Sequence, residues 1–290
     1  MATAQEIRDL LHGGTTVVMP GVYDALSARL ATQAGFEVLF VSGYSVSASR
    51  LAAPDFGYLT QTEIAQAARD VCSATDRPVI VDADTGYGNP LSTMRTARLL
   101  HAAGAAGIFL EDQEWPKKCG HYEGKRVVQR DEWLAKLQAV VDLRKEEVDL
   151  FLVARTDSAA AVGLDEAIAR ARAARDIGVD AVFVEAPRSV EDLERVTAGV
   201  EGAVRVANMI EGGKTPLLPP AELHALGYDL IVTPLAGLFA AAKALSEAYA
   251  AMRREGTLRN HMHLILDFEA FNRITDLAHH EELERTYGPP

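Results

Sequence analysis

Residues 117–121, with the sequence Lys-Lys-Cys-Gly-His, place two cations, a thiol and an imidazole within five positions. A nearby positive charge favours the thiolate form of cysteine, so we expect the pKa of Cys119 to be lowered. A free cysteine is most often a small buried hydrophobe, but the polar neighbours here favour a reactive thiol. The sequence therefore predicts that Cys119 carries a proton in a reaction.

The polar, glycine-containing character of residues 117–121 predicts a loop. A loop of this kind can be mobile, and one that closes over a site excludes water from it. The imidazole of His121 can act as a second proton donor or as a hydrogen-bonding group that holds the loop. The sequence leaves both roles open.

Polar residues also follow short apolar runs at several places, at the points where buried strands would end. In an α/β barrel these ends meet at the C-terminal mouth, where the chemistry of such folds takes place. We therefore expect these residues to lie close together. In chain order they are Ser42, Gly43, Asp82, Asp84, Glu111, Asp112, Arg155, Asp157, Glu185 and Asn208.

Three of these residues, Asp82, Asp84 and Glu111, offer several carboxylate oxygens in one place. Mg²⁺ prefers oxygen ligands, and it takes only one or two protein ligands directly. Any one acid at a strand end could instead cap the helix that follows. Taken together, and without an equal supply of basic partners, the acids favour a metal site.

Arg155 directly follows an apolar run. Its planar guanidinium suits an anionic group, which it can bind with two parallel hydrogen bonds. A structural ion pair with Glu185 or Asp157 is equally compatible with the sequence, and both roles can coexist.

Eight short apolar runs recur along the chain, with Ala-rich amphipathic segments between most of them. Runs that are continuously apolar, instead of alternating, are typical of parallel strands buried on both faces. The pattern predicts a (β/α)8 TIM barrel. A doubly wound sheet is the alternative, but the first run lacks the glycine fingerprint of such sheets. The runs are residues 17–19, 38–41, 79–81, 108–110, 150–153, 181–184, 204–207 and 230–232.

We expect a single barrel domain over residues 1–290, because this length lies within the range of one large barrel. After Leu235 the pattern becomes almost wholly helical. Residues 240–290 are therefore predicted to form a C-terminal helical extension. A tail beyond the eighth strand is free to pack on a partner subunit.

The composition is that of a globular chain, with 48% hydrophobic residues and a formal charge of −12 from 41 acids and 29 bases. No basic stripe could neutralise a phosphate backbone, so nucleic acid is not an expected partner. Two cysteines, Cys72 and Cys119, give no disulfide framework, which favours the cytoplasm. We expect neither a signal peptide nor a membrane span.

Two glycine-rich segments match nucleotide-binding motifs only in part. Residues 212–215, Gly-Gly-Lys-Thr, end like a P-loop, but Asn208 stands where the pattern requires its first glycine. Residues 85–89 lack the three-glycine spacing of a dinucleotide site. We therefore reject an ATPase, and we interpret the second segment as a tight loop that presents Asp84.

Six segments together resemble the isocitrate lyase and phosphoenolpyruvate mutase superfamily, and residues 117–121 resemble its branch with a catalytic cysteine. The resemblance implies a (β/α)8 barrel, Mg²⁺ with Mn²⁺ as the alternative, and a small α-keto or α-hydroxy acid ligand. It also implies a homo-oligomer, a dimer or a homotetramer, whose C-terminal helices are exchanged between subunits. The segments are residues 20–25, 82–88, 111–113, 117–121, 154–157 and 208–216.

The resemblance also implies roles for individual positions. The segment that grips the carboxylate of an α-keto acid would be Ser42, Gly43 and Tyr44. The metal site would have Asp84 as direct ligand, completed largely through water by Asp55, Asp82 and Glu111. The catalytic residues of a gating loop would be Lys117, Cys119 and His121. The substrate-contacting residues would be Gly120, Arg155, Glu185 and Asn208.

The implied reaction is the cleavage of a carbon–carbon bond. Lyases of this superfamily release an α-keto acid from a 2-hydroxy acid and leave a carbanion, which Cys119 would protonate. Members that cleave 2-methylisocitrate have an arginine after the eighth strand, where this chain has residues 233–239, ending in Phe239. Phe239 cannot bind a carboxylate, so a smaller substrate such as 2,3-dimethylmalate is favoured over a 2-methylisocitrate-like tricarboxylate.

A phosphonomutase is the rival interpretation. Residues 207–216 also resemble carboxyphosphonoenolpyruvate phosphonomutases, which share the cysteine loop and form a carbon–phosphorus bond. A barrel that binds a keto acid without turnover is the third, and the thiol loop and acidic residues together argue against it. The sequence does not separate the lyase from the mutase.

Overall fold

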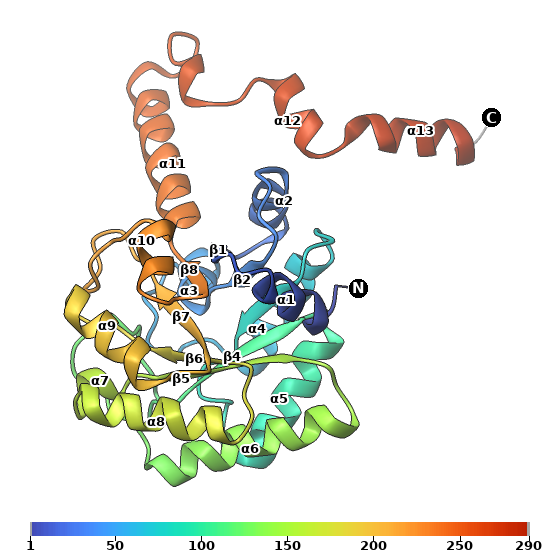
Figure 1. Cartoon of the computed structure of the whole chain (residues 1–290). Helices are drawn as coiled ribbons and strands as arrows, with labels where there is room; N and C mark the ends of the chain where they lie inside the picture. The colour runs from blue at the N-terminus through green and yellow to red at the C-terminus, as the bar shows by residue number, and fades with distance from the viewer. Residues whose placement is uncertain (1, 289–290) are drawn as a thin grey trace. The chain divides into compact units, whose positions relative to one another are not determined.

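The structure, a computed structural model, describes residues 2–288. Its eight parallel strands pair in chain order, and the eighth pairs with the first to close a barrel (Figure 1). The predicted (β/α)8 barrel is confirmed. The strands are β1 (Val17–Val22), β2 (Leu39–Val41), β3 (Val79–Asp82), β4 (Gly107–Glu111), β5 (Phe151–Thr156), β6 (Ala181–Val184), β7 (Val204–Asn208) and β8 (Leu230–Thr233).

Helices lie between successive strands and surround the barrel (Figure 1). Helix α1 comes before the first strand, and two helices in a row follow both β2 and β5. The helices of this unit are α1 (Ala4–His12), α2 (Ala25–Gln33), α3 (Gly43–Leu51), α4 (Gln61–Cys72), α5 (Pro90–Ala102), α6 (Arg130–Glu146), α7 (Ser158–Ala161), α8 (Leu164–Asp176), α9 (Val190–Gly199) and α10 (Pro220–Ala225).

Most positions of each strand are apolar because the strand packs against two apolar layers. In β5, Phe151 and Val153 belong to the cluster inside the barrel. Leu152 and Ala154 belong to the larger cluster beneath the helices. Successive side chains of a strand point to opposite faces, so a strand buried on both faces must be apolar at every position. Polar residues therefore collect where the strands end.

The acids at the strand ends do not cap the helices that follow. The N-cap of α5 is Asn89, whose side chain accepts a hydrogen bond from the amide of Ser92, and the N-cap of α6 is Gln129. The capping alternative is therefore wrong for Asp82, Asp84 and Glu111. These side chains are free to form the site described below.

A second compact unit begins at Leu238 and contains the rest of the described chain. Its elements are helical, with α11 starting two residues before the boundary: α11 (Ala236–Glu255), the 3₁₀ helix η1 (Met262–Leu264), α12 (Phe268–Ile274) and α13 (Leu277–Tyr287). The exchange of these helices between subunits stays a prediction. Within residues 2–288 no helix has the length and apolar character needed to cross a membrane.

Candidate active site

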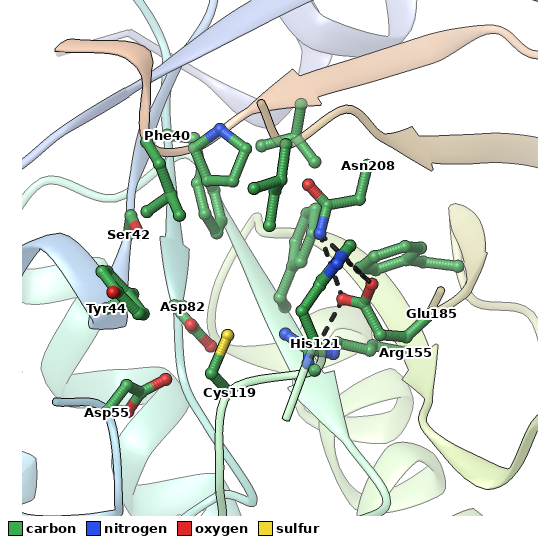
Figure 2. Close-up of a pocket in the computed structure, with 17 residues that line it drawn as sticks. Phe40, Ser42, Tyr44, Asp55, Asp82, Cys119, His121, Arg155, Glu185 and Asn208 are labelled. Carbon is green, nitrogen blue, oxygen red and sulfur yellow. Dashed lines mark hydrogen bonds and ion pairs between the residues drawn. The ribbon is translucent and has the colours of Figure 1, made fainter. Parts of the chain in front are cut away.

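A cavity of about 40 Å³ lies at the C-terminal ends of the barrel strands (Figure 2). By this measure a single water needs roughly 10–15 Å³, so the cavity has room for a small ligand. Polar and apolar groups share its lining, which consists of Phe40, Ser42, Tyr44, Asp55, Asp82, Phe109, Cys119, Gly120, His121, Arg155, Phe183, Glu185, Asn208, Ile210, Val232, Pro234 and Leu235.

The start of α3 forms one side of this cavity, through Ser42 and Tyr44. Ser42 is the N-cap residue of the helix, and its hydroxyl accepts a hydrogen bond from the amide of Ser45. The first turn of a helix presents free amides and the positive end of the helix dipole, which favour an anion. A Cβ on Gly43 would lie 2.9 Å from Asp82 Oδ2, so glycine permits this close approach. The geometry therefore suits the predicted carboxylate-binding role of residues 42–44.

The four carboxylates predicted to hold a metal, here called the acid cluster, are Asp55, Asp82, Asp84 and Glu111. Lys117 reaches into this cluster: its Nζ lies 2.8 Å from Asp55 Oδ2 and 2.5 Å from Asp84 Oδ1. Burial would lower the pKa of Lys117, but Asp55 and Asp84 hold it well above its ordinary value. Lys117 is thus a charged counter-ion of the acid cluster.

Positive charge is nevertheless scarce at this end of the barrel. Among the described residues, seven buried carboxylates stand against five buried cations, a formal excess of two negative charges (7 − 5). The carboxylates are the acid cluster, Asp112, Asp157 and Glu185, and the cations are Lys117, Lys125, Lys136, Arg155 and Arg170.

Two members of the acid cluster show the effect of this imbalance. Burial raises the pKa of Asp84 to about 6 although Lys117 opposes the shift. Burial also raises the pKa of Glu111 well above its ordinary value, although Arg155 and Lys117 oppose it. Both oxygens of Glu111 are buried, and neither accepts a hydrogen bond. A divalent cation would supply the missing positive charge and a partner for these oxygens.

The donor set fits a hydrated cation and not a protein cage. Across residues 2–288, no three Asp, Glu, His or Cys side chains converge closely enough to hold a metal ion by themselves. Mg²⁺ commonly keeps several waters and uses one or two carboxylates directly. The acid cluster offers the oxygen donors that Mg²⁺ or Mn²⁺ prefers, and the arrangement with Asp84 as direct ligand stays a prediction.

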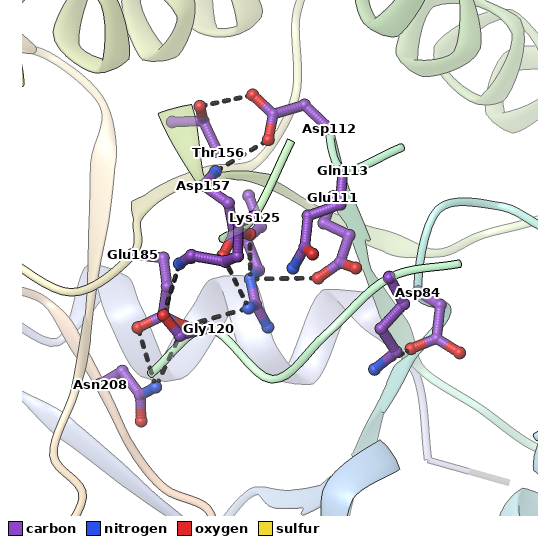
Figure 3. A network of polar contacts seen from close by, with 12 residues as sticks. Asp84, Glu111, Asp112, Gln113, Gly120, Lys125, Thr156, Asp157, Glu185 and Asn208 are labelled. Carbon is purple, nitrogen blue, oxygen red and sulfur yellow. Dashed lines mark hydrogen bonds and ion pairs between the residues drawn. The ribbon is translucent and has the colours of Figure 1, made fainter. Parts of the chain in front are cut away.

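Arg155 forms ion pairs with three carboxylates, those of Glu111, Asp157 and Glu185. Figure 3 shows these three acids in the polar network. Its Nε lies 2.9 Å from Asp157 Oδ2 and 3.3 Å from Glu111 Oε2, and its Nη2 lies 3.3 Å from Glu185 Oε2. The guanidinium also lies 5.5 Å from the ring centroid of Phe183. Arg155 also lines the cavity, so its side chain can pair with these carboxylates and face a ligand at the same time.

Cys119 lines the cavity with 9% of its surface exposed. Its amide donates a hydrogen bond to the carbonyl of Asp55 at 3.0 Å, which joins the loop to the segment before α4. Burial raises the pKa of the Cys119 thiol to about 12. The prediction of a lowered pKa is therefore wrong, because Lys117 pairs with the acid cluster and the thiol is buried. The thiol keeps its proton at neutral pH.

Two residues that the sequence did not assign hold this loop in place. The side-chain amide of Gln113 donates to the carbonyl of Lys118 at 2.8 Å and accepts from the Lys118 amide at 2.9 Å. Lys125 Nζ donates to the carbonyl of Gly120 and, at 2.8 Å, to Asp157 Oδ1. Lys125 offers no signal in the sequence, since its importance comes from burial beside Asp157. Gln113 stands in the segment 111–113 that carries the family resemblance.

His121 links the loop to two other parts of the barrel. Its Nδ1 accepts a hydrogen bond from the backbone amide of Lys214 at 2.9 Å. Its Nε2 lies 3.2 Å from Glu185 Oε1. A neutral imidazole that accepts at Nδ1 carries its proton on Nε2, facing Glu185. These contacts favour the loop-holding role, although the ring also lines the cavity.

Glu185 and Asn208 form a fixed pair beside Arg155 (Figure 2). The amide of Asn208 donates to both oxygens of Glu185 at 3.2 Å. Burial would raise the pKa of Glu185, but Arg155 and His121 hold it below its ordinary value. Asn208 Oδ1 is buried without a hydrogen-bond partner. This acceptor is available to a hydroxyl or a protonated group of a ligand.

The last two strands supply a different surface, here called the apolar wall, made of Ile210, Val232, Pro234 and Leu235. After β8, the last described residue that lines the cavity is Leu235. Phe239 belongs to the second unit. The interpretation that Phe239 limits the substrate therefore stays a prediction, and the apolar residues of the first unit that line the cavity after β8 are Pro234 and Leu235.

The chain is similar to several known proteins. The sequence profile of the family described as phosphoenolpyruvate phosphomutase matches residues 7–253. The chloroplastic carboxyvinyl-carboxyphosphonate phosphorylmutase of Arabidopsis thaliana is 50% identical over 276 residues, which cover 94% of this chain and 81% of that protein. The 2,3-dimethylmalate lyase of Eubacterium barkeri is 41% identical over 288 residues, 99% of each chain.

Solved structures agree with these sequence matches. A crystal structure of 2,3-dimethylmalate lyase superposes with a TM-score of 0.93 and 34% identity, over 99% of this chain and 96% of that one. A phosphonopyruvate hydrolase in complex with oxalate and Mg²⁺ superposes with a TM-score of 0.88 and 26% identity, over 99% of each chain. Lyases, mutases and a hydrolase thus share this fold.

Proposed function

The chain belongs to the phosphoenolpyruvate phosphomutase family, an enzyme superfamily of lyases and mutases, and we propose that it is a metal-dependent carbon–carbon lyase. Its substrate would be a small, alkyl-substituted 2-hydroxy dicarboxylate, and its products an α-keto acid and a carboxylic acid. One observation carries the proposal: a protonated thiol, two members of the acid cluster (Asp55 and Asp82) and the apolar wall face one cavity of about 40 Å³.

The substrate would bind with its C1 carboxylate at the start of α3. The amides of that helix terminus attract an anion, and Ser42 and Tyr44 lie beside them. A base then takes the proton of the 2-hydroxyl. Asp55 and Asp82 are the members of the acid cluster that line the cavity, so one of them is the base in this proposal.

Cys119 would complete the reaction as a general acid. When the C2–C3 bond breaks, its electron pair stays on C3, next to the second carboxylate. Burial keeps the Cys119 thiol protonated, and a carbanion is far more basic than a thiolate. The thiol therefore transfers its proton to C3, and the carboxylic acid product is formed.

The acid cluster would hold Mg²⁺ or Mn²⁺, with Asp84 as the direct ligand and Asp55, Asp82 and Glu111 acting through water. When bound, such a cation offsets negative charge on the oxygen of the forming keto acid, a contribution of several kcal/mol. The excess of buried carboxylates supports this assignment. The Mg²⁺ complex of a phosphonopyruvate hydrolase with the same fold supports it as well.

The apolar wall favours 2,3-dimethylmalate over a tricarboxylate. Ile210, Val232, Pro234 and Leu235 offer no cation for a third carboxylate, but they suit the methyl groups of a branched substrate. The small cavity points the same way. With this substrate the products would be pyruvate and propionate. A 41% identical relative is a 2,3-dimethylmalate lyase, in agreement with this choice.

A phosphonomutase is the second candidate, favoured by the 50% identity to a phosphorylmutase. A phosphonate substrate brings additional negative charge into the cavity and needs cations that are free to bind it. Here Lys117, Lys125 and Arg155 are already paired with buried carboxylates. The geometry therefore supports the lyase better.

The deciding experiment incubates the full chain and MgCl2 with 2,3-dimethylmalate, 2-methylisocitrate, oxaloacetate and carboxyphosphonoenolpyruvate. Keto acid release is followed through a coupled dehydrogenase, and phosphorus NMR follows C–P bond formation. We expect pyruvate from 2,3-dimethylmalate and loss of that activity in EDTA. No keto acid from any hydroxy acid would overturn the lyase proposal, and a new C–P signal would support the mutase.

We also propose that the chain is a homo-oligomer, a dimer or a tetramer, with exchanged C-terminal helices. The unit after Leu238 exposes large apolar side chains, among them Tyr249, Leu266 and Phe268. Such side chains commonly mark a surface that another subunit covers. Light scattering of the full chain should give the mass of two or four subunits, and a monomer at micromolar concentration would contradict the proposal.

A further inference from the structure

The loop between β3 and α5 has an unusual backbone. Four of its residues have positive φ angles: Asp84 at 48°, Gly86 at 84°, Tyr87 at 58° and Gly88 at 146°. Glycine adopts such angles freely and aspartate tolerates them, but a bulky residue such as tyrosine rarely does. Tyr87 is therefore held in an unfavourable conformation that its surroundings must maintain.

Two donors from neighbouring helices fix the backbone of this loop. Thr96 Oγ1 in α5 donates to the carbonyl of Gly86 at 3.0 Å. Lys136 Nζ in α6 donates to the carbonyl of Thr85 at 3.3 Å. Both bonds hold the peptide groups immediately before Tyr87. The position of the Tyr87 ring is thus determined by these hydrogen bonds, and not by the φ angle that tyrosine prefers.

The side chain of Tyr87 makes two contacts of different kinds. Its hydroxyl donates a hydrogen bond to Asp84 Oδ2 at 2.7 Å. Its ring lies against Trp115, with the ring centroids 5.8 Å apart and an angle of 52° between the planes. Asp84 is the proposed metal ligand, and Trp115 precedes the cysteine segment by two residues. Tyr87 is thus in contact with both.

Both oxygens of the Asp84 carboxylate therefore have a neighbour whose position depends on a second loop, residues 114–126, which carries Lys117 and Cys119. Oδ1 lies 2.5 Å from Nζ of Lys117, which is itself a loop residue. Oδ2 accepts the hydrogen bond from Tyr87, whose ring rests on Trp115 of the same loop. If the loop moves away, the first contact breaks and the second loses its support.

We propose that Tyr87 is a positioning residue that couples the closed state of the loop, residues 114–126, to the orientation of the Asp84 carboxylate. The closed loop holds the ring through Trp115, and the hydroxyl then holds Oδ2 and so fixes the orientation of the whole Asp84 carboxylate. This inference rests on the proposed function and on the expectation from the sequence that this loop is mobile and closes over the site. The coupling would explain why the Asp84 carboxylate takes its final orientation only when the loop is closed and Cys119 lines the cavity.

Loop opening can be measured through the thiol that the loop buries. Iodoacetamide alkylates Cys119 when the loop opens, and Cys72 in α4 is an internal reference in the same molecule. We expect Tyr87→Phe to raise the Cys119 rate about fivefold relative to Cys72, the effect of losing one hydrogen bond. Trp115→Leu should act similarly. Tyr58→Phe, which removes a hydroxyl from an exposed tyrosine, should leave the rate unchanged.

The double variant distinguishes coupling from two separate structural effects. If Tyr87 and Trp115 act through each other, the double variant is alkylated about as fast as either single variant, whereas independent effects multiply to about 25-fold. A Tyr87→Phe rate equal to that of the unmodified chain would overturn the proposal. A multiplicative double variant would overturn it too.

Mn²⁺ binding tests whether the coupling reaches Asp84. Calorimetry with Mn²⁺ alone should show a ten- to hundredfold weaker affinity for Tyr87→Phe, about the range for removing an outer partner of a ligating carboxylate. Trp115→Leu should weaken binding by a smaller factor, and an unchanged affinity in that variant would overturn the coupling to the metal carboxylate. Neither measurement uses a substrate, so failure of the proposed cleavage reaction would leave both results unaffected.

Discussion

The two sides of the cavity differ in nearly every physical property. The acid cluster, with Lys117 and Arg155 beside it, is buried, charged and short of positive partners. The apolar wall, from Ile210 to Leu235, carries no charge and comes from the last two strands. Cys119 and His121, both on the loop of residues 117–121, line the same cavity. One side can stabilise developing charge, whereas the other can accept only a hydrocarbon surface.

This difference separates the reaction from the choice of substrate. Charge that develops on an oxygen during bond cleavage is stabilised by fixed charges in a water-excluded site. An apolar pocket instead distinguishes substrates by about 1–3 kcal/mol per methylene. We therefore expect changes in the acid cluster to abolish the reaction and changes in the apolar wall to alter its substrate range. The following predictions test that division.

The largest effect is expected at Asp84. Asp84→Asn keeps the shape of the side chain but removes the charge that would bind the metal directly. Losing several kcal/mol of metal stabilisation should lower kcat more than about 1000-fold. Calorimetry should show no Mn²⁺ binding in this variant. Asp131→Asn, in the exposed first turn of α6, is the matched control and should be fully active.

The proposed separation of roles between the acid cluster and the apolar wall would be wrong if an Asp84→Asn variant kept its activity, or if the enzyme were fully active in EDTA. Either result would show that the acid cluster stabilises the fold and takes no part in the reaction. A circular dichroism spectrum and a thermal unfolding curve check that the variant is folded.

Cys119 should give the next largest effect. A serine hydroxyl is a much weaker acid than a thiol, so Cys119→Ser should lower kcat roughly 100- to 1000-fold, the usual range for a general acid. Metal affinity should not change, because Cys119 is not in the acid cluster. Cys72→Ser provides the control for a generic loss of a thiol. Normal turnover by Cys119→Ser would remove this residue from the mechanism.

The pH profile gives an independent check on the same residue. Burial raises the pKa of the thiol to about 12, so Cys119 should hold its proton throughout the neutral range. We expect kcat not to decline between pH 7 and pH 9 through loss of this proton. A decline in this range that disappears in Cys119→Ser would show that the thiol ionises there and that its environment is less apolar than the structure indicates.

The acid cluster could be predicted from the sequence, and the reason is geometric. Strands buried on two faces are apolar throughout, so Asp82 and Glu111 stand out where two of them end. Barrel closure then brings the ends of distant strands together. The sequence did not show that Lys117 is directed into this cluster. The pKa of Cys119 was predicted in the wrong direction for the same reason, since sequence neighbours are not neighbours in space.

The apolar wall could not be predicted in this way. An apolar residue that lines a cavity has the same character in the sequence as one that fills the core. Val232 belongs to the core cluster inside the barrel and also lines the cavity. The prediction consequently named Phe239, because an aromatic residue stood where an arginine was expected. Only the fold shows that Leu235 lines the cavity.

Leu235 should therefore change which substrates are used. Leu235→Ala removes apolar contact from the wall, and kcat/KM for 2,3-dimethylmalate should fall about 10- to 100-fold. A substrate with a longer alkyl group at C3 should lose less, because the enlarged cavity accommodates it. Mn²⁺ affinity should stay the same. The control is Leu217→Ala, since Leu217 is 57% exposed.

An equal loss for short and long substrates would contradict the assigned role of the apolar wall. Thermal unfolding must accompany the kinetics, because truncating a buried leucine to alanine destabilises a fold by about 2–5 kcal/mol. The ratio of the two kcat/KM values is the decisive quantity, since a partly unfolded preparation lowers both values equally.

The smallest effects are expected at His121 and Lys214, where the loop meets the side of the barrel that carries the apolar wall. His121→Ala removes the acceptor for the Lys214 amide and the contact with Glu185, so kcat should fall about fivefold through a less well-held loop. Lys214→Ala keeps the amide and removes only an exposed pair with Glu123, so kcat should change less than twofold. If His121→Ala instead lost as much activity as Cys119→Ser, the imidazole would be a second proton donor. The loop would then supply both protonating groups, and the boundary between the two sides would itself be part of the chemistry.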